Sequence, residues 1–258
     1  MIVVLSPAKS LDFKTPPTLT AFSQPLHLDQ AQLLIDRLRQ FSPAELASLM
    51  KISDPLAVLN ATRYGEWARP FTPENAKSAA LAFNGDVYDG LQAPTLREDD
   101  WSFAQERLRI LSGLYGMLRP FDLIQPYRLE MGTRLANPRG RDLYAFWGDR
   151  LTVALDEDLR AISAGRLINL ASEEYFKAIV PKKLSVPVLQ PVFEDWSGGR
   201  YRVVSFFAKR ARGRMARFVI DERLDDASGL QAFAADGYRF VAEASDDRVW
   251  VFRRRLER

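Results

Sequence analysis

Short apolar runs alternate with segments of helical spacing along the whole chain, and this alternation limits the folds that the chain can adopt. Apolar runs at residues 2–5, 166–170 and 186–194 predict buried strands. Helical spacing predicts helices at residues 42–50 and 141–159. No repeat, low-complexity block or flexible linker separates these segments. We therefore expect one compact domain over residues 1–258 with an α+β fold, in which helices flank a mixed sheet.

Three further expectations concern less regular segments. Residues 72–75 have the composition of a helix start and predict a helix that ends before Asn84. Residues 201–207 predict a strand that leads into a basic helix. Residues 238–243 and 249–252 predict a closing β-hairpin.

The most basic stretch follows that apolar run, and five of its nine residues are Lys or Arg, with no acid among them. A helix there places Ala211 and Met215 against the core and turns the cations outward. Such a surface suits a polyanion, and an ordinary solvated helix face is the alternative. The five cations are Lys209, Arg210, Arg212, Arg214 and Arg217.

The positive charge of the chain is local. Residues 199–258 carry 14 basic and 9 acidic residues, a net charge of +5, whereas the first 198 residues carry 22 and 24, a net charge of −2. This asymmetry favours a defined basic patch over general attraction to anions.

Residues 46–57 predict two short helices joined by a hairpin. Leu49, Ile52 and Ala57 match the apolar positions of the helix-hairpin-helix motif, in which hairpin amides hold a phosphate of duplex DNA. Lys51 and Ser53 replace the two glycines of that motif and offer a cation and a hydroxyl. The segment is either a phosphate-binding hairpin or a plain pair of packed helices.

Polar residues after the apolar runs are candidates for chemistry. Lys9 follows the first predicted strand, where α/β sheets often hold ligands, and is a phosphate ligand, an amine nucleophile or a plain turn lysine. Asp86 and Tyr88 lie in a glycine-flanked segment that is either an acid site or a common turn. Asn169 and Glu173 follow another predicted strand.

A turn at residues 113–116 is expected to bring Arg119 and Arg128 to a common surface, where both are candidate phosphate ligands. The chain has no Cys, which excludes disulfides and thiolate sites, and its one histidine, His27, lies in a Pro-rich loop. We expect no metal and no cofactor. No apolar run approaches the ~18 residues of a membrane span. These features fit a cytoplasmic location, no membrane contact and no obligate protein partner.

Eight blocks, taken in order, resemble one family from end to end. They are SPAKSL (6–11), LMKISD (49–54), FNGDVY (83–88), LSGLYG (111–116), QPYRLEMG (125–132), FWGD (146–149), INLASE (168–173) and SFFAKRARG (205–213). The chain resembles the bacterial YaaA family. This resemblance implies a role in the peroxide-stress response, linked to limiting free intracellular iron. It also implies a mixed α/β fold with a positively charged cleft and a helix-hairpin-helix element that binds double-stranded DNA.

The leading hypothesis is a protein that binds duplex DNA mainly through phosphates. The basic run would form one wall of a cleft, Lys51 and Ser53 would hold a phosphate, and Lys9 would close the floor. Engagement of about five cations predicts a slope of log affinity against log salt near −4 to −5.

The rival hypothesis is an enzyme that acts on a nucleic-acid base or nucleotide. It requires the side chains of Lys9, Asp86, Tyr88, Asn169 and Glu173 to meet in one pocket beside the basic helix. Direct iron binding is a third hypothesis, and the lack of Cys and the single His argue against it.

Overall fold

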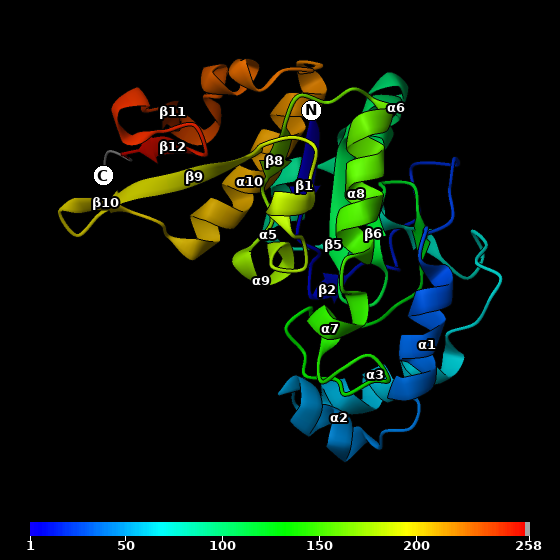
Figure 1. Ribbon diagram of the computed structural model, residues 1–258. Helices are drawn as coiled ribbons and strands as arrows, with labels where there is room; N and C mark the ends of the chain where they lie inside the picture. The colour runs from blue at the N-terminus through cyan, green and yellow to red at the C-terminus, as the bar shows by residue number, and fades with distance from the viewer. Residues whose placement is uncertain (256–258) are drawn as a thin grey trace.

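The computed structural model describes residues 1–255 and has a mixed sheet at its centre (Figure 1). The sheet strands are β1 (Ile2–Leu5), β5 (Leu108–Ser112), β6 (Gly116–Leu118), β8 (Leu167–Asn169), β9 (Val188–Ser197), β10 (Arg200–Arg202), β11 (Arg239–Phe240) and β12 (Val249–Arg254). Their order is β11-β12-β9-β8-β1-β5-β6, and β10 pairs with the end of β9. The inner pairs from β12 to β5 are parallel, and β6, β10 and β11 pair antiparallel.

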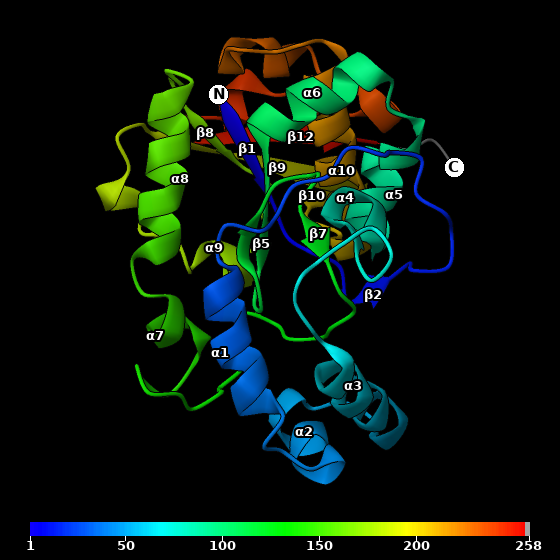
Figure 2. The ribbon, with the colours of Figure 1, turned by 90° about the vertical axis from the view of Figure 1, so that its right-hand side faces the viewer.

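Helices cover both faces of this sheet, which confirms the expected α+β fold. The helices are α1 (Leu28–Leu38), α2 (Pro43–Met50), α3 (Asp54–Glu66), α4 (Ala79–Ala82), α5 (Asp86–Leu91), α6 (Glu98–Arg107), α7 (Leu143–Trp147), α8 (Arg150–Ala161), α9 (Glu173–Phe176) and α10 (Ser205–Asp221). Figure 2 shows α8 on one face of the sheet and α5, α6 and α10 on the other. Two small ribbons complete the fold. They are β2 (Ser10–Leu11) with β4 (Phe83–Asn84), and β3 (Lys77–Ser78) with β7 (Leu123–Ile124).

The carboxyl ends of the central strands point toward one group of helices. All four residues of β1 are buried, as its unbroken apolar sequence predicts. Because β1 runs parallel to β5 and β8, the loops that follow β1 and β8 emerge at the same edge of the sheet. Helices α1, α2 and α3 lie beyond that edge (Figure 1). A site formed at this edge therefore has α2 and α3 on its far side.

Helix α10 packs against the sheet and crosses α5 closely at two glycines, Gly90 and Gly213. Its buried positions Ala208, Ala211 and Met215 recur at helical spacing and form the core face, as the sequence indicates for Ala211 and Met215. A Cβ atom at Gly213 would overlap the backbone carbonyl of Val87, and one at Gly90 would overlap that of Arg210. Only glycine allows the two backbones to approach this closely.

Several predicted elements are confirmed at nearly the predicted bounds. The runs at 2–5 and 166–170 contain β1 and β8, and the run at 186–194 covers β9 up to residue 194, three residues before its end. The helix at 42–50 is α2, and the last two strands pair antiparallel as β11 and β12.

Three predicted elements are wrong, each for a local reason. The helix from residue 72 is replaced by a turn in which the Thr72 amide donates to Asn75 Oδ1 (2.9 Å), followed by β3. In the run at 201–207 the strand ends at Arg202, and the remainder turns into α10 with Phe206 largely exposed. The helix at 141–159 is interrupted by Gly148, whose φ of 52° is left-handed.

The close approach of α5 and α10 predicts opposite effects for two Gly→Ala substitutions in helices. Helix propensity alone favours alanine by about 0.5–1 kcal/mol at both positions. We expect Gly65→Ala in α3, where nothing lies within 4 Å of the new Cβ, to stabilise the protein by about that amount. We expect Gly213→Ala to destabilise it by about 1–3 kcal/mol through overpacking. Urea unfolding measures the free energy of unfolding of both variants. Stabilisation by Gly213→Ala would contradict the direct backbone contact between α5 and α10.

Candidate functional site

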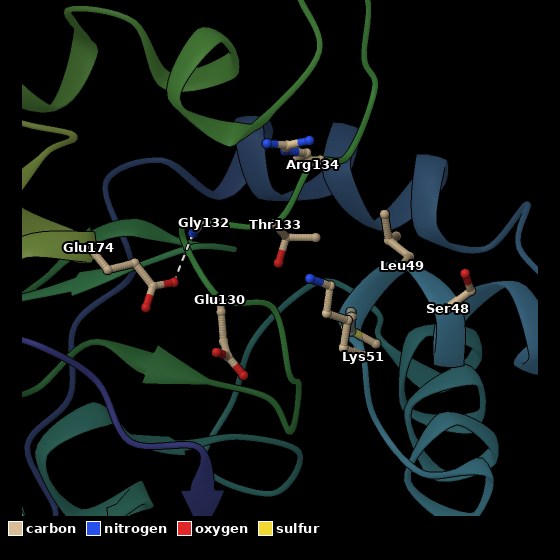
Figure 3. Close-up of a pocket in the computed structure, with 9 residues that line it drawn as sticks. Ser48, Leu49, Lys51, Glu130, Gly132, Thr133, Arg134 and Glu174 are labelled. Atoms are coloured by element: carbon tan, nitrogen blue, oxygen red, sulfur yellow. Dashed lines mark hydrogen bonds between the residues drawn. The ribbon is translucent and has the colours of Figure 1, made fainter.

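A cleft of about 680 Å³ lies between the end of α2 and the segment 130–134 (Figure 3). Lys51 lines one wall, and Glu130, Thr133 and Arg134 line the other. Figure 3 shows the Lys51 ammonium directed across the cleft toward Thr133. Glu174 of α9 closes one end of the cleft.

Helix α2 begins with a complete capping box. The Ser42 hydroxyl accepts from the Glu45 amide (3.4 Å), and the Glu45 carboxylate accepts from the Ser42 amide (2.7 Å). Pro43 occupies the first turn, where its missing N–H has no helical role. The sequence pattern at residues 42–45 therefore sets the start of α2 and the direction in which it approaches the cleft.

The turn between α2 and α3 is short and tightly bonded. Lys51 ends α2 in the left-handed conformation (φ 53°), which glycine adopts more readily. The Ile52 amide donates to the carbonyl of Ala47 (3.1 Å), and Ala57 is fully buried between the helices. Ser53 precedes α3 with its side chain free of any capping bond. Pro55 has no amide N–H, so the amides of Asp54 and Leu56 are the donors at this exposed start of α3 that have no partner within the helix.

A second hollow of about 410 Å³ lies where β1 ends. Its polar lining comes from four segments that are distant in sequence. These residues include Ser6, Lys9, Asp86, Tyr88, Ser172, Glu174, Lys209 and Arg212. Glu174 lines both this cavity and the cleft, so the two hollows adjoin. This is the carboxyl edge of a partly parallel sheet, where ligand sites commonly form.

Ion pairs and a backbone amide hold the carboxylates of Glu130 and Glu174 between the hollows. Glu130 pairs with Lys9 and with Arg128, at 3.0 Å in each case. Glu174 accepts a hydrogen bond from the Gly132 amide (2.9 Å). These contacts join the loop after β1, the segment 128–132 and α9 into one polar network.

Most of the basic run on α10 is paired with acids from other positions. Arg210 and Arg214 lie 3.5 and 3.8 Å from Asp236, and Arg217 lies 2.7 Å from Asp221. Lys209 lies 4.0 Å from Asp86 at the cavity. The lack of acids within the run therefore does not leave a bare cationic face, because Asp236 meets two of its arginines.

Arg212 differs from the rest of the run. It is half-buried and lines the cavity, and among residues 1–255 it has no hydrogen bond or ion pair. Burial lowers the pKa of its guanidinium, as expected for a cation that is partly desolvated and has no acid beside it.

The five candidate catalytic residues separate into two groups. Lys9, Asp86 and Tyr88 line the cavity, whereas Asn169 and Glu173 line another hollow of about 540 Å³. Asn169 stabilises the turn after β8, because its Oδ1 accepts a hydrogen bond from the Ala171 amide (3.0 Å). The Tyr88 hydroxyl donates to the Ser6 carbonyl (3.0 Å), and burial raises its pKa well above the usual range. Tyr88 is therefore a neutral donor that supports the loop after β1.

The structure does not give Arg119 and Arg128 a common partner. Arg119 binds Asp158 of α8 (2.9 Å), and Arg128 binds Glu130 beside the cleft. Asp158 also binds the buried Arg109 (2.6 Å), so Arg119 belongs to a network that ties α8 to β5.

Comparisons of the sequence with known proteins identify its family. The family model described as peroxide stress protein YaaA matches residues 1–244. The chain belongs to this family. It is 61% identical over 255 residues to a UPF0246 protein of Dechloromonas aromatica, with 99% of each chain covered. It is also 61% identical over 262 residues to a UPF0246 protein of Azoarcus sp., with both chains fully covered, and 60% identical over 255 residues to one of Ralstonia nicotianae, with 99% of each covered.

In this YaaA-family chain, sequence reasoning missed Glu130, Glu174 and the pair Ser6 and Ser172. The Ser172 amide donates to Ser6 Oγ (2.8 Å), which joins the loops that follow β1 and β8. Both serines directly follow predicted strands, and that position was the available signal. Glu130 lies in an irregular segment and Glu174 in the short helix α9, and the meeting of these two segments depends on tertiary packing.

His27 packs beside Trp147 with ring centroids 5.6 Å apart, and burial lowers its pKa. Within residues 1–255, no cluster of three or more His, Cys, Asp or Glu side chains could hold a metal ion. No helix in that range is both long enough and apolar enough to span a membrane.

Proposed function

We propose that this protein of the peroxide-stress family binds double-stranded DNA, with the α2–α3 hairpin as the main phosphate site. The observation that carries the proposal is the hairpin at the mouth of the cleft. There Lys51 and Ser53, whose hydroxyl makes no capping bond, lie in the turn that leads into α3, and the amides of Asp54 and Leu56 begin that helix. A cation beside a helix N-terminus is a suitable receptor for a backbone phosphate.

The neighbouring cations extend this contact along the two hollows. Arg134 lines the cleft, and Lys9 and Lys209 line the adjoining cavity. With Lys51 they form a set of four that a phosphate backbone passing over the hollows would meet. Glu130, Glu174 and Asp86 lie among them, so contact depends on placing phosphates at particular cations and not on overall positive charge. The affinity of such binding depends on DNA shape more than on base sequence.

The salt dependence of binding tests the number of phosphate contacts. Arg210, Arg214 and Arg217 line neither the cleft nor the cavity, so the expected set changes from the five cations of the basic run to the four cations named above. We expect log affinity for duplex DNA to fall against log salt with a slope between about −3 and −4. Fluorescence anisotropy over a salt series measures this slope, and a nearly flat response would exclude phosphate-dominated binding.

The substitution Lys51→Gly should weaken DNA binding without lowering the stability of the protein. Glycine suits the left-handed conformation at this position, so the free energy of unfolding should stay constant or rise by up to about 1 kcal/mol. The salt slope should become shallower by about 0.9, because one phosphate contact is lost. Ser163→Gly is the matched control, since Ser163 is also left-handed (φ 50°) but carries no charge. An unchanged slope in Lys51→Gly would remove the hairpin from the interface.

We further propose that the protein limits free intracellular iron, the role implied by its family resemblance, and that it does so through DNA binding. The same Lys51→Gly variant tests this link in peroxide-treated cells, where free iron should rise relative to cells carrying Ser163→Gly. Equal iron levels in the two strains, with DNA binding weakened only in the first, would show that iron limitation does not depend on this DNA contact.

A second candidate function is an enzyme that acts on a nucleic-acid base or nucleotide. The five side chains that this hypothesis first required do not meet in one pocket, because Asn169 and Glu173 line another hollow. A smaller set favours a revised form of it, since one cavity beside α10 brings an amine, Lys9, near two carboxylates, Asp86 and Glu174. Such groups support amine-based or acid–base chemistry. We expect Lys9→Gln to abolish the release of base or nucleotide from damaged duplex DNA, and Lys14→Gln to retain it. Absence of any released product with the wild-type protein would reject this candidate.

A further inference from the structure

Arg212 stands apart from every other cation of the basic run. The other four lie within 4.0 Å of a carboxylate, whereas Arg212 meets none among the described residues. Arg212 is three residues after Lys209, so the two side chains leave the same flank of α10 and line the same cavity. A guanidinium withdrawn from solvent without an acid beside it is a suitable receptor for an anion that comes from outside the protein.

The cavity also offers a hydroxyl donor. Ser6 Oγ accepts from the Ser172 amide (2.8 Å) and donates to Ser172 Oγ (3.3 Å). The Ser172 hydroxyl thus receives a hydrogen bond, and its own proton is not donated to any group in residues 1–255. The hydrogen-bond donors available to an anionic ligand in the cavity are therefore the Arg212 guanidinium, the Lys209 ammonium and the Ser172 hydroxyl.

The remaining lining residues indicate the chemistry of the rest of the ligand. Val87, Leu170 and Tyr175 provide apolar surface, and Asp86 and Glu174 provide acceptors for a ligand that carries hydroxyl or amino groups. The volume of about 410 Å³ lies within the range of small-molecule sites. A molecule with an anionic end, an apolar ring and hydrogen-bond donors satisfies all three features.

We propose that this cavity binds the phosphate monoester of a nucleotide, with Arg212 as its anchor. A monoester carries nearly two negative charges at pH 7 and three terminal oxygens, which match the three donor groups of the cavity. An internal phosphodiester of DNA carries one charge and two free oxygens and fits them less well. The site therefore goes beyond backbone binding at the hairpin. Its ligand is either a free mononucleotide or the 5′-terminal phosphate of a strand.

Calorimetric titration of the full chain tests the proposal in two arms. In the first, each of the four 2′-deoxynucleoside 5′-monophosphates is compared with the nucleoside that lacks the phosphate. In the second, a 5′-phosphorylated duplex is compared with the same duplex ending in 5′-hydroxyl groups. We expect a preference of at least about tenfold for the phosphorylated ligand in one arm, as a charge-assisted bidentate contact provides. The arm that shows it identifies the source of the monoester.

Arg212→Gln should reduce that affinity by about 10- to 100-fold. Arg214→Gln is the matched control, because Arg214 lies on the same helix but faces Asp236 outside the cavity, and it should retain wild-type affinity. If Arg212→Gln does not fold, Ser172→Ala in the wild-type background provides the second variant, with an expected loss of several-fold. No phosphate preference in either arm, or unchanged affinity in the variant, would overturn the proposal.

A closed DNA dumbbell, which has no strand ends, keeps this test separate from duplex binding. If the dumbbell binds with the expected salt slope and no monoester is preferred, only the cavity proposal fails. If monoesters bind through Arg212 and the dumbbell does not bind, only the duplex proposal fails.

Discussion

The arrangement of the site depends on the close packing of α5 against α10 through Gly90 and Gly213. Their backbones touch directly, and a single added Cβ at either glycine would overlap a main-chain atom of the other helix. This contact places the start of α5, with Asp86, beside Lys209 and Arg212 on α10. A looser crossing would separate the acid from the two cations and would open the cavity to solvent.

The parallel pairing of β1 with β8 provides the other half of the cavity. Their loops emerge together, and the bond between the Ser172 amide and Ser6 Oγ joins them. Packing between glycines and pairing between buried strands thus bring four distant segments to one place. The hairpin of α2 and α3 lies across the adjoining cleft and supplies Lys51 (Figure 3). The fold therefore presents the two sites that we propose as phosphate receptors, one at a helix start on the surface and one half-buried beside α10.

The sequence predicted those features that local patterns determine. Continuous apolar runs located β1, β8 and β9, and the residues Ser42, Pro43 and Glu45 located the start of α2. It could not predict that Asp236 would meet Arg210 and Arg214, because that contact joins segments far apart in the chain. For the same reason the sequence did not indicate that Glu130 and Glu174 line the cleft. It also led us to place Asn169 in the cavity beside α10, which Asn169 does not line. The run at 201–207 misled because its phenylalanines begin a helix and one of them faces solvent.

A crystal structure of the protein bound to duplex DNA tests the central claim most directly. We predict a backbone phosphate at the first amides of α3, within reach of Lys51 and Ser53, and a path for the same strand toward Lys9 and Lys209. The Arg210, Arg214 and Arg217 side chains should keep their acidic partners in that complex. DNA bound on the face of α10 that carries those three arginines, with the α2–α3 hairpin free of contacts, would contradict the claim.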